Sequence, residues 1–196
     1  MTRKAPRQKR MDDILEAAVN EFVEKGYDNA SMEAIATRAG LTKGGLYHHF
    51  SSKEEILIAA NSLFMQPVYD CMDKAKKKKT APDALRHYIR SYLAYWETHP
   101  QEIIFVFLSL VKMLSSQGMW PLYKTYYTEM RSFFETLLTQ GIDQGDFAPH
   151  DTRARSVALM SALDGAIGYL IMVPEVTLAS MTAWFDEVFI RPIMKA

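Results

Sequence analysis

The chain lacks several features that would point to particular classes of protein. It has one cysteine, Cys71, among 196 residues, so no disulfide can form within it. Its longest apolar run, at 103–111, is about half the length that a membrane-spanning helix requires. The segment behind the first ten residues, MDDILEAAVNEF, is amphipathic and acidic, unlike the apolar core of a secretory signal. We therefore expect a cytoplasmic protein with no membrane association.

Net charge is also absent, because 23 basic residues balance 23 acidic ones. The overall charge therefore gives no indication of nucleic-acid binding, but its distribution does. Residues 1–10 contain no acid and five basic side chains: Arg3, Lys4, Arg7, Lys9 and Arg10. Such an arm either lies along phosphates or remains a solvated tail, and the sequence leaves both open.

Sustained alternation of apolar and polar residues is missing, and the few glycines and prolines are spaced as helix ends are. The sequence therefore predicts an all-α fold. We expect a break or a kink in the fourth helix at Pro67. The expected helices cover about 10–25, 32–39, 42–50, 53–75, 83–99, 102–114, 121–140, 151–172 and 178–190.

The most informative segment is SMEAIATRAGLTKGGLYHHF at 31–50, which fits two short helices joined by a tight turn at Gly40. Ser31 and Thr42 are suitable N-caps. The expected inward side chains are those of Ile35, Ala36, Leu41 and Leu46.

The second helix of this segment opens with Gly44 and Gly45, at a cost of roughly 1 kcal/mol each relative to alanine. Missing side chains would let the helix N-terminus approach a phosphate or a base edge. The layout is that of a helix-turn-helix that reads the major groove. The expected DNA-binding residues are Ser31, Thr42, Lys43, Gly44, Gly45, Tyr47, His48 and Lys53. We expect no metal at His48–His49, because adjacent side chains point to different helix faces and no Cys or acid cluster accompanies them.

Residues 41–57, LTKGGLYHHFSSKEEIL, resemble the recognition segment of the TetR family of transcriptional regulators. Gly26-Tyr27, Ser31, Ile35-Ala36 and Ala39-Gly40 stand in that family's order. One departure is Gly45, where the family often has Thr or Ser. The resemblance implies a three-helix DNA-binding domain, placed here at 1–52, and a helical bundle for ligand binding and dimerisation at 53–196.

Segment 83–172 is rich in aromatic and methionine side chains. For any single residue the core is the better interpretation, whereas the set as a whole fits a cavity for an apolar or aromatic ligand. The family resemblance favours the cavity. The candidate ligand residues are His87, Tyr92, Trp96, Phe105, Trp120, Tyr123, Tyr126, Tyr127, Met130 and Asp164.

The last two helices have the apolar and small residues of a dimer surface. They would either pack on the chain's own core or form a four-helix interface with a second copy, which is the arrangement that the resemblance implies. The candidate dimer residues are Met160, Leu163, Ile167, Leu170, Trp184 and Val188.

Together these features predict a homodimeric, ligand-responsive regulator, most simply a repressor that a small effector releases from a palindromic double-stranded DNA operator. It would need no cofactor. Two other classes stay open: a small α-helical enzyme acting on an aromatic ligand, and a helical adaptor that binds no DNA. The enzyme would have to use Cys71, His87 or Asp164, and no nucleophile–base set stands out at helical spacing.

Overall fold

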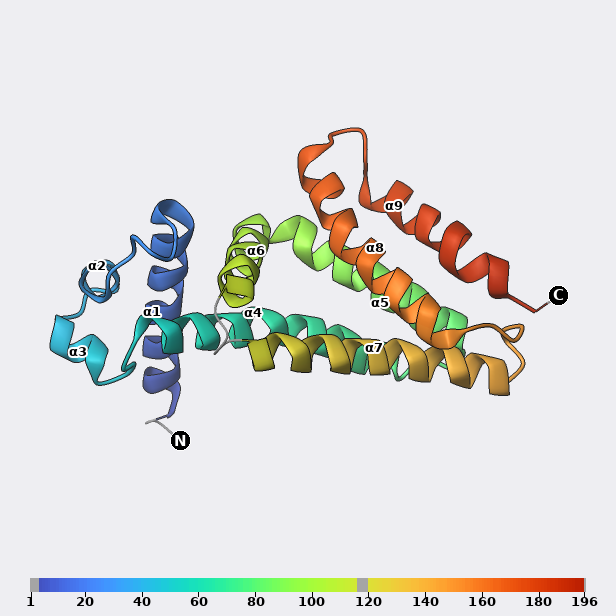
Figure 1. Cartoon of the computed structure of the whole chain (residues 1–196), viewed down its shortest axis with the longest axis horizontal. Helices are drawn as coiled ribbons and strands as arrows, with labels where there is room; N and C mark the ends of the chain where they lie inside the picture. The colour runs from blue at the N-terminus through green and yellow to red at the C-terminus, as the bar shows by residue number, and fades with distance from the viewer. Residues whose placement is uncertain (1–3, 116–119, 196) are drawn as a thin grey trace. The chain divides into compact units, whose positions relative to one another are not determined.

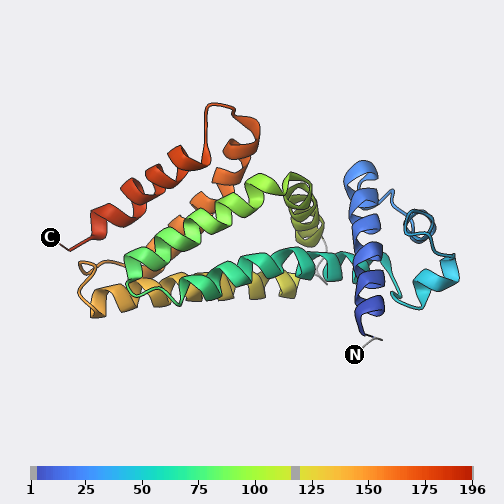
Figure 2. The same cartoon turned by 180° about the vertical axis from the view of Figure 1, so that it is seen from behind.

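The computed structural model describes residues 4–115 and 120–195; of residues 4–7 and 120–123 it describes the helical backbone alone. The regular elements of the described chain are helices, as predicted, apart from one isolated bridge between Phe147 and Met194. The helices are α1 (Lys4–Lys25), α2 (Met32–Arg38), α3 (Lys43–Tyr47), α4 (Lys53–Ala75), α5 (Ala81–Thr98), α6 (Pro100–Ser115), α7 (Trp120–Asp143), α8 (Thr152–Met172) and α9 (Leu178–Phe185) (Figures 1 and 2).

These helices form two compact units. The N-terminal unit comprises residues 1–66 and 101–119, and the C-terminal unit comprises residues 67–100 and 120–196. The first unit thus contains α1–α3, the first half of α4, and α6. The functional boundary at 52/53 stays a prediction.

One helix boundary differs from the predicted one, and the structure decides between two alternatives inside another helix. α1 begins at Lys4, so most of the predicted basic arm is helical; Pro6 lies in the first turn, where no backbone N–H needs a partner. α4 runs through Pro67 without ending. Of the two alternatives at Pro67, the uninterrupted helix is therefore the correct one.

The core of the N-terminal unit is built where α1 meets α2 and α2 meets α3. Ile35, Ala36 and Leu46 are buried as predicted, whereas Leu41 is half-buried. Phe105 of α6 stacks on Phe22 of α1, with ring centroids 6.2 Å apart. Burial of these side chains fixes α2 and α3 against α1.

The core of the C-terminal unit is aromatic. The ring of Tyr88 on α5 lies 5.1 Å from Phe133 and 5.2 Å from Phe134, both on α7. Its hydroxyl donates to the sulfur of Met130. Pairs of this kind stabilise a core beyond the area that they bury.

The turn between α7 and α8 is hydrogen-bonded to the start of α5 and to the C-terminal segment after α9. A Cβ on Gly141 would come within 2.2 Å of the Phe147 ring, so only glycine fits there. The Asp146 carboxylate accepts from the backbone N–H of Ala81 at the start of α5, and the Asp146 carbonyl accepts from Lys195 N. After α9 the chain continues as a π-helical turn, Asp186–Ile190, and a 3-10 turn, Arg191–Ile193.

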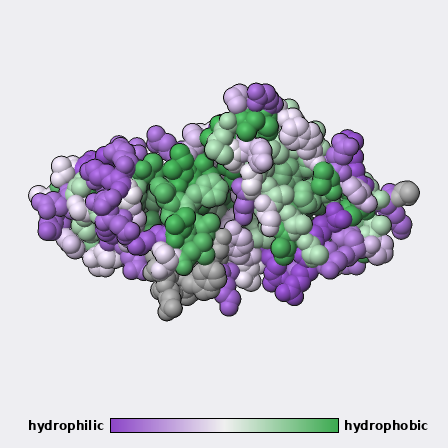
Figure 3. All heavy atoms as spheres, turned by 45° about the horizontal axis from the view of Figure 1, so that its top comes forward, coloured by the Kyte–Doolittle hydropathy of each residue, from purple (hydrophilic) through white to green (hydrophobic). Residues whose placement is uncertain are grey.

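Apolar residues cover more than one side of several helices. α8 is the described helix that is long and apolar enough to cross a membrane by length and composition, a test that core helices of soluble proteins also pass. α6 exposes one continuous apolar stripe, seen as a green patch left of centre in Figure 3. The stripe consists of Ile104, Phe107, Leu108, Val111 and Leu114.

Candidate DNA-binding surface and ligand site

Both short helices of the helix-turn-helix begin with a side-chain cap. The Ser31 hydroxyl accepts from Ala34 N at 3.1 Å, and the Thr42 hydroxyl accepts from Gly45 N at 3.1 Å. Gly40, between them, has a φ of +66°, which side chains other than glycine rarely adopt. These local features set the turn that leads into α3.

The predicted reading residues lie on one exposed side of α3. Thr42, Lys43, Gly44 and His48 are exposed, and 48% of Tyr47 is accessible. Leu46 points the opposite way and is completely buried. The helix thus presents a cation, hydroxyls and an imidazole, beside a start without side chains, and these are groups that contact phosphates and base edges.

The two glycines of α3 have different surroundings. A Cβ on Gly45 would lie 3.2 Å from the Thr42 hydroxyl, so this position is tight within the chain itself. A Cβ on Gly44 would meet nothing within 4 Å. Packing within the protein therefore explains Gly45 in part and gives no reason for Gly44.

The structure gives Lys53 a different set of partners from the predicted phosphate. Its Nζ donates to the carbonyls of Tyr27 and Ala30, at 2.8 and 2.6 Å, and lies 4.8 Å from the centre of the Tyr27 ring. The ammonium group thus holds the turn between α1 and α2. A DNA contact by Lys53 stays a prediction, and it would have to compete with these bonds.

Lys112 of α6, which the sequence did not indicate, also contacts the turn between α1 and α2. Its Nζ lies 2.7 Å from the Asp28 carboxylate and 4.9 Å from the centre of the Tyr27 ring. The hydrogen bond to Lys112 holds the pKa of Asp28 below its usual range. These two residues are 84 positions apart, so no local pattern in the sequence marks the pair.

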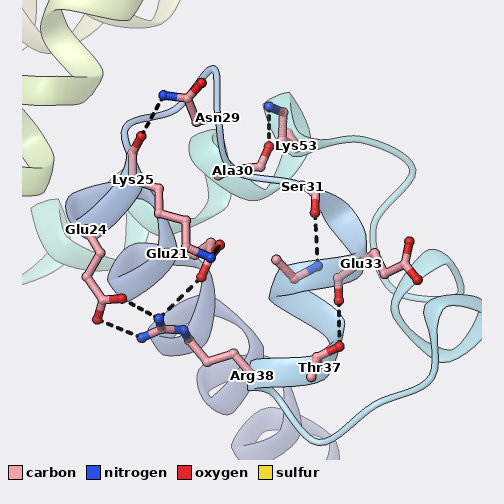
Figure 4. A network of polar contacts seen from close by, with 11 residues as sticks. Glu21, Glu24, Lys25, Asn29, Ala30, Ser31, Glu33, Thr37, Arg38 and Lys53 are labelled. Atoms are coloured by element: carbon pink, nitrogen blue, oxygen red, sulfur yellow. Dashed lines mark hydrogen bonds and ion pairs between the residues drawn. The ribbon is translucent and has the colours of Figure 1, made fainter.

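Arg38, also missed, joins α2 to α1 (Figure 4). Its guanidinium binds the Glu24 carboxylate through two nitrogens and lies 3.3 Å from Glu21, whose side chain is almost fully buried. Lys25 also pairs with Glu21, at 2.5 Å. A buried acid of this kind needs such partners, because an unpaired buried charge is costly. The network therefore sets α2, and with it α3, against α1.

Among the predicted ligand residues, Tyr92, Tyr127 and Asp164 come together. The Asp164 carboxylate accepts from the Tyr127 hydroxyl at 2.9 Å and from the Tyr92 hydroxyl at 3.3 Å. Burial raises the pKa of Asp164, and the two hydroxyls oppose this effect. The cluster links α5, α7 and α8.

The other predicted ligand residues are divided between the two units. Phe105 is buried in the core of the N-terminal unit, where Phe22 and Phe64 pack on it, whereas Trp96 and Met130 belong to the C-terminal unit. A role of Phe105 in ligand binding stays a prediction. Trp96 and Met130 are buried, and Trp96 Nε1 has no hydrogen-bond partner among the described residues.

Four further candidates remain: Tyr126, His87, Trp120 and Tyr123. The ring of Tyr126 lies edge-on to Tyr127 at 5.3 Å. Burial lowers the pKa of His87, and the positive charges of Lys78 and Lys74 lower it further. The side chains of Trp120 and Tyr123 lie outside the described residues. The described part of the C-terminal unit has a groove between α7 and α8 that includes Tyr127.

The predicted dimer face needs a correction on α8. Met160, Leu163 and Ile167 are buried within the chain, because α5 and α7 pack on that side of the helix. Leu170 is half-buried. The exposed apolar side chains of α8 are Val157, Tyr169, Ile171 and Met172, and those of α9 and the turn after it are Trp184 and Val188.

The residues that the enzyme alternative requires are not brought together. No hydrogen bond among the described residues joins Cys71, His87 and Asp164 to one another. Burial raises the pKa of the Cys71 thiol, which disfavours the nucleophilic thiolate.

Comparisons with known proteins agree with this geometry. Residues 14–60 match the model of the bacterial regulatory proteins, tetR family. The HTH-type transcriptional repressor KstR2 of Mycolicibacterium smegmatis is 26% identical over 142 residues, which are 71% of this chain and 68% of that protein.

Solved structures share the fold over nearly the whole chain. The TetR family transcriptional regulator PfmR from Thermus thermophilus has a TM-score of 0.75 and 28% identity, covering 90% of this chain and 96% of that one. AibR, solved in complex with isovaleryl coenzyme A and operator DNA, has a TM-score of 0.74 and 20% identity over 92% of this chain and 98% of that one, and so supports the fold alone. In residues 14–60 the chain thus resembles the tetR family of bacterial regulatory proteins, and its fold is similar to that of a solved TetR-family regulator over nearly the whole chain.

Proposed function

We propose that this protein is a ligand-responsive transcriptional repressor that binds operator DNA through α3. The observation that carries the proposal is the exposed start of that helix. Gly44 there has a propensity cost, and a Cβ added to it would meet nothing within 4 Å, beside exposed Lys43. The close approach of a DNA backbone or base edge would explain why a residue without a side chain stands at this position.

Dimerisation supplies the second half of the proposed reading unit. The exposed apolar side chains at the end of α8 and on α9 offer a surface that a second copy would cover, with Trp184 as a large anchor. Two-fold symmetry would then place two α3 helices on half-sites of a near-palindromic operator, about one helical turn apart.

Release by an effector follows from the same arrangement. A ligand that binds one spacing of the two reading helices better than another shifts the population toward that spacing. AibR, which shares the fold and was solved in complex with isovaleryl coenzyme A and operator DNA, supports the proposal of a small-molecule effector for this chain. KstR2, a repressor by name, supports repression.

The test is a DNA-binding titration of the full chain at several salt concentrations, on a duplex selected from bound genomic fragments. We expect Lys43→Gln to lower the affinity and to reduce the salt slope by about 1. Gly44→Ala should weaken binding about tenfold while the chain stays folded, because the added methyl group meets nothing within the protein.

The matched control for Lys43→Gln is Lys77→Gln, since both lysines are exposed and Lys77 lies in the turn after α4. If the control weakens DNA binding as much as Lys43→Gln does, affinity comes from diffuse charge and the proposed reading surface is wrong. Unchanged affinity in both Lys43→Gln and Gly44→Ala would also overturn it.

A further inference from the structure

A groove of about 440 Å³ lies between α7 and α8 in the C-terminal unit. On α7 its lining residues recur at intervals of three and four, so they form one stripe along the helix. The same spacing holds on α8. The lining comprises Lys124, Tyr127, Thr128, Arg131, Val157, Met160 and Ser161.

Two cations stand at the two ends of the α7 stripe. Lys124 and Arg131 are separated by two turns, roughly 10 Å along the helix axis. Lys124 is exposed and in no ion pair within the described part of the chain. Arg131 is half-buried and pairs with Glu135 at 2.6 Å. The lining itself contains no acidic side chain.

The α8 side of the groove consists of two apolar side chains, Val157 and Met160, and one hydroxyl, that of Ser161. Tyr127 lines the groove while its hydroxyl donates to the buried Asp164 carboxylate. Asp164 in turn accepts from Tyr92 of α5. A molecule seated in the groove therefore lies against a side chain that is bonded into the interior of the unit.

We propose that this groove binds a small molecule with an apolar body and one acidic group, held by Lys124 or Arg131. The proposal rests on the proposed function, for which it names the effector class. An ammonium ligand would meet two like charges, and a neutral apolar ligand would cover Lys124 without pairing its charge. A carboxylate forms a charge-assisted hydrogen bond with either cation.

The first experiment compares three probes of equal chain length: octanoate, 1-octanol and octylammonium. Isothermal titration at pH 7 uses the full chain without DNA. We expect saturable octanoate binding at one molecule per chain, with 1-octanol at least tenfold weaker and octylammonium weakest. Equal binding of the three probes would overturn the proposal, and so would no octanoate binding, the result expected if a second copy of the chain fills the groove.

Variants then locate the site. Lys124→Gln and Arg131→Gln should each weaken octanoate binding about five- to tenfold and leave 1-octanol binding unchanged. The matched controls are Lys77→Gln and Arg153→Gln, which remove exposed cations of the same unit outside the groove. An equal loss in the controls would mean that octanoate responds to overall charge, and the groove would be wrong.

DNA binding, measured separately, distinguishes this proposal from the proposed function. Octanoate binding with the expected variant pattern supports the groove even if the chain binds no DNA, in which case the regulator fails alone. DNA binding without any octanoate binding overturns the groove alone. Octanoate that binds in the groove and leaves DNA affinity unchanged confirms the site and removes its role as the effector site.

Discussion

The two units differ in how side chains from distant parts of the sequence are joined. In the N-terminal unit, charged side chains link helices around the reading segment: Arg38 to Glu21 and Glu24, and Lys112 to Asp28. In the C-terminal unit, rings centred on Tyr88 join α5 to α7, with a long-range ion pair between Arg86 and Asp186 beside them. Ion pairs are directional, so they hold helices in one orientation, whereas packed rings fill the space between helices.

The glycines show the same difference. Gly44 of the N-terminal unit has open space around it, and Gly141 of the C-terminal unit has the Phe147 ring where its Cβ would be. The first glycine is unexplained until a partner is supplied. The second is explained completely by the protein's own packing. A glycine that costs stability without filling a structural need is thus the better marker of an interface.

The largest expected effect concerns Phe105, which sequence reasoning placed among ligand residues and the structure places in the N-terminal core. Phe105→Ala should lower the free energy of unfolding by about 3–5 kcal/mol, because it leaves a cavity beside Phe22. The measurement is urea unfolding. Phe107→Ala, on the same helix but 41% exposed against 0% for Phe105, should cost much less.

The comparison between the units would break if Phe105→Ala kept its stability and lost octanoate binding. Phe105 would then be a ligand residue after all, and α6 would belong functionally with the C-terminal unit.

The second prediction separates two exposed apolar faces. Val188→Glu should raise the dimer dissociation constant at least tenfold, since two-fold symmetry places the charge in the interface twice. Val111→Glu on α6 should leave it unchanged. The two valines are 59% and 66% exposed, so they are closely matched.

Sedimentation over a range of concentrations gives the dissociation constant. A monomer in the Val111→Glu variant alone would move the dimer surface to the N-terminal unit. Equal effects of both substitutions would mean that neither face is specific.

The smallest expected effect is a pH dependence at Asp164. Because burial raises its pKa in the folded chain, the folded state binds a proton more tightly than the unfolded state does. The stability of the protein should therefore fall as the pH rises from about 4, the pKa of an unfolded aspartate, through the folded-state pKa.

Asp164→Asn removes this contribution. As the pH rises over that interval, the free energy of unfolding of the variant should therefore increase relative to that of the wild type. Urea unfolding between pH 4 and 7 gives the difference at each pH. The exposed carboxylate of Asp83 provides a control, since Asp83→Asn should follow the wild-type profile. A constant difference between Asp164→Asn and wild type across the range would contradict the assignment.

The helix-turn-helix was predictable from sequence because its helices are short and capped. Ser31, Gly40 and Thr42 are local signals, and each acts in the structure as its residue type suggests. Burial of Ile35 and Leu46 follows from the same spacing. Arg38 and Lys112 were not predictable, because their partners depend on tertiary packing.

The long helices were predictable as elements but not as faces. α8 carries apolar residues on several sides, so periodicity could not tell the side that packs on α5 and α7 from the side that remains exposed. Met160, Leu163 and Ile167 were therefore assigned to the surface although they are core. The groove between α7 and α8 could likewise not be predicted, since Lys124 and Arg131 line it together with residues about thirty positions later in the sequence.

The fastening of the α7–α8 turn bears on how the chain is made. Ala148 N donates to the Ile193 carbonyl and Lys195 N to the Asp146 carbonyl, while Asp146 also receives the first N–H of α5. The N-terminal unit has all its helices once α6 has been synthesised, whereas the C-terminal unit cannot close until residues 193–195 have left the ribosome. A reading domain would thus be complete on a nascent chain whose proposed effector and dimer surfaces are still unfinished.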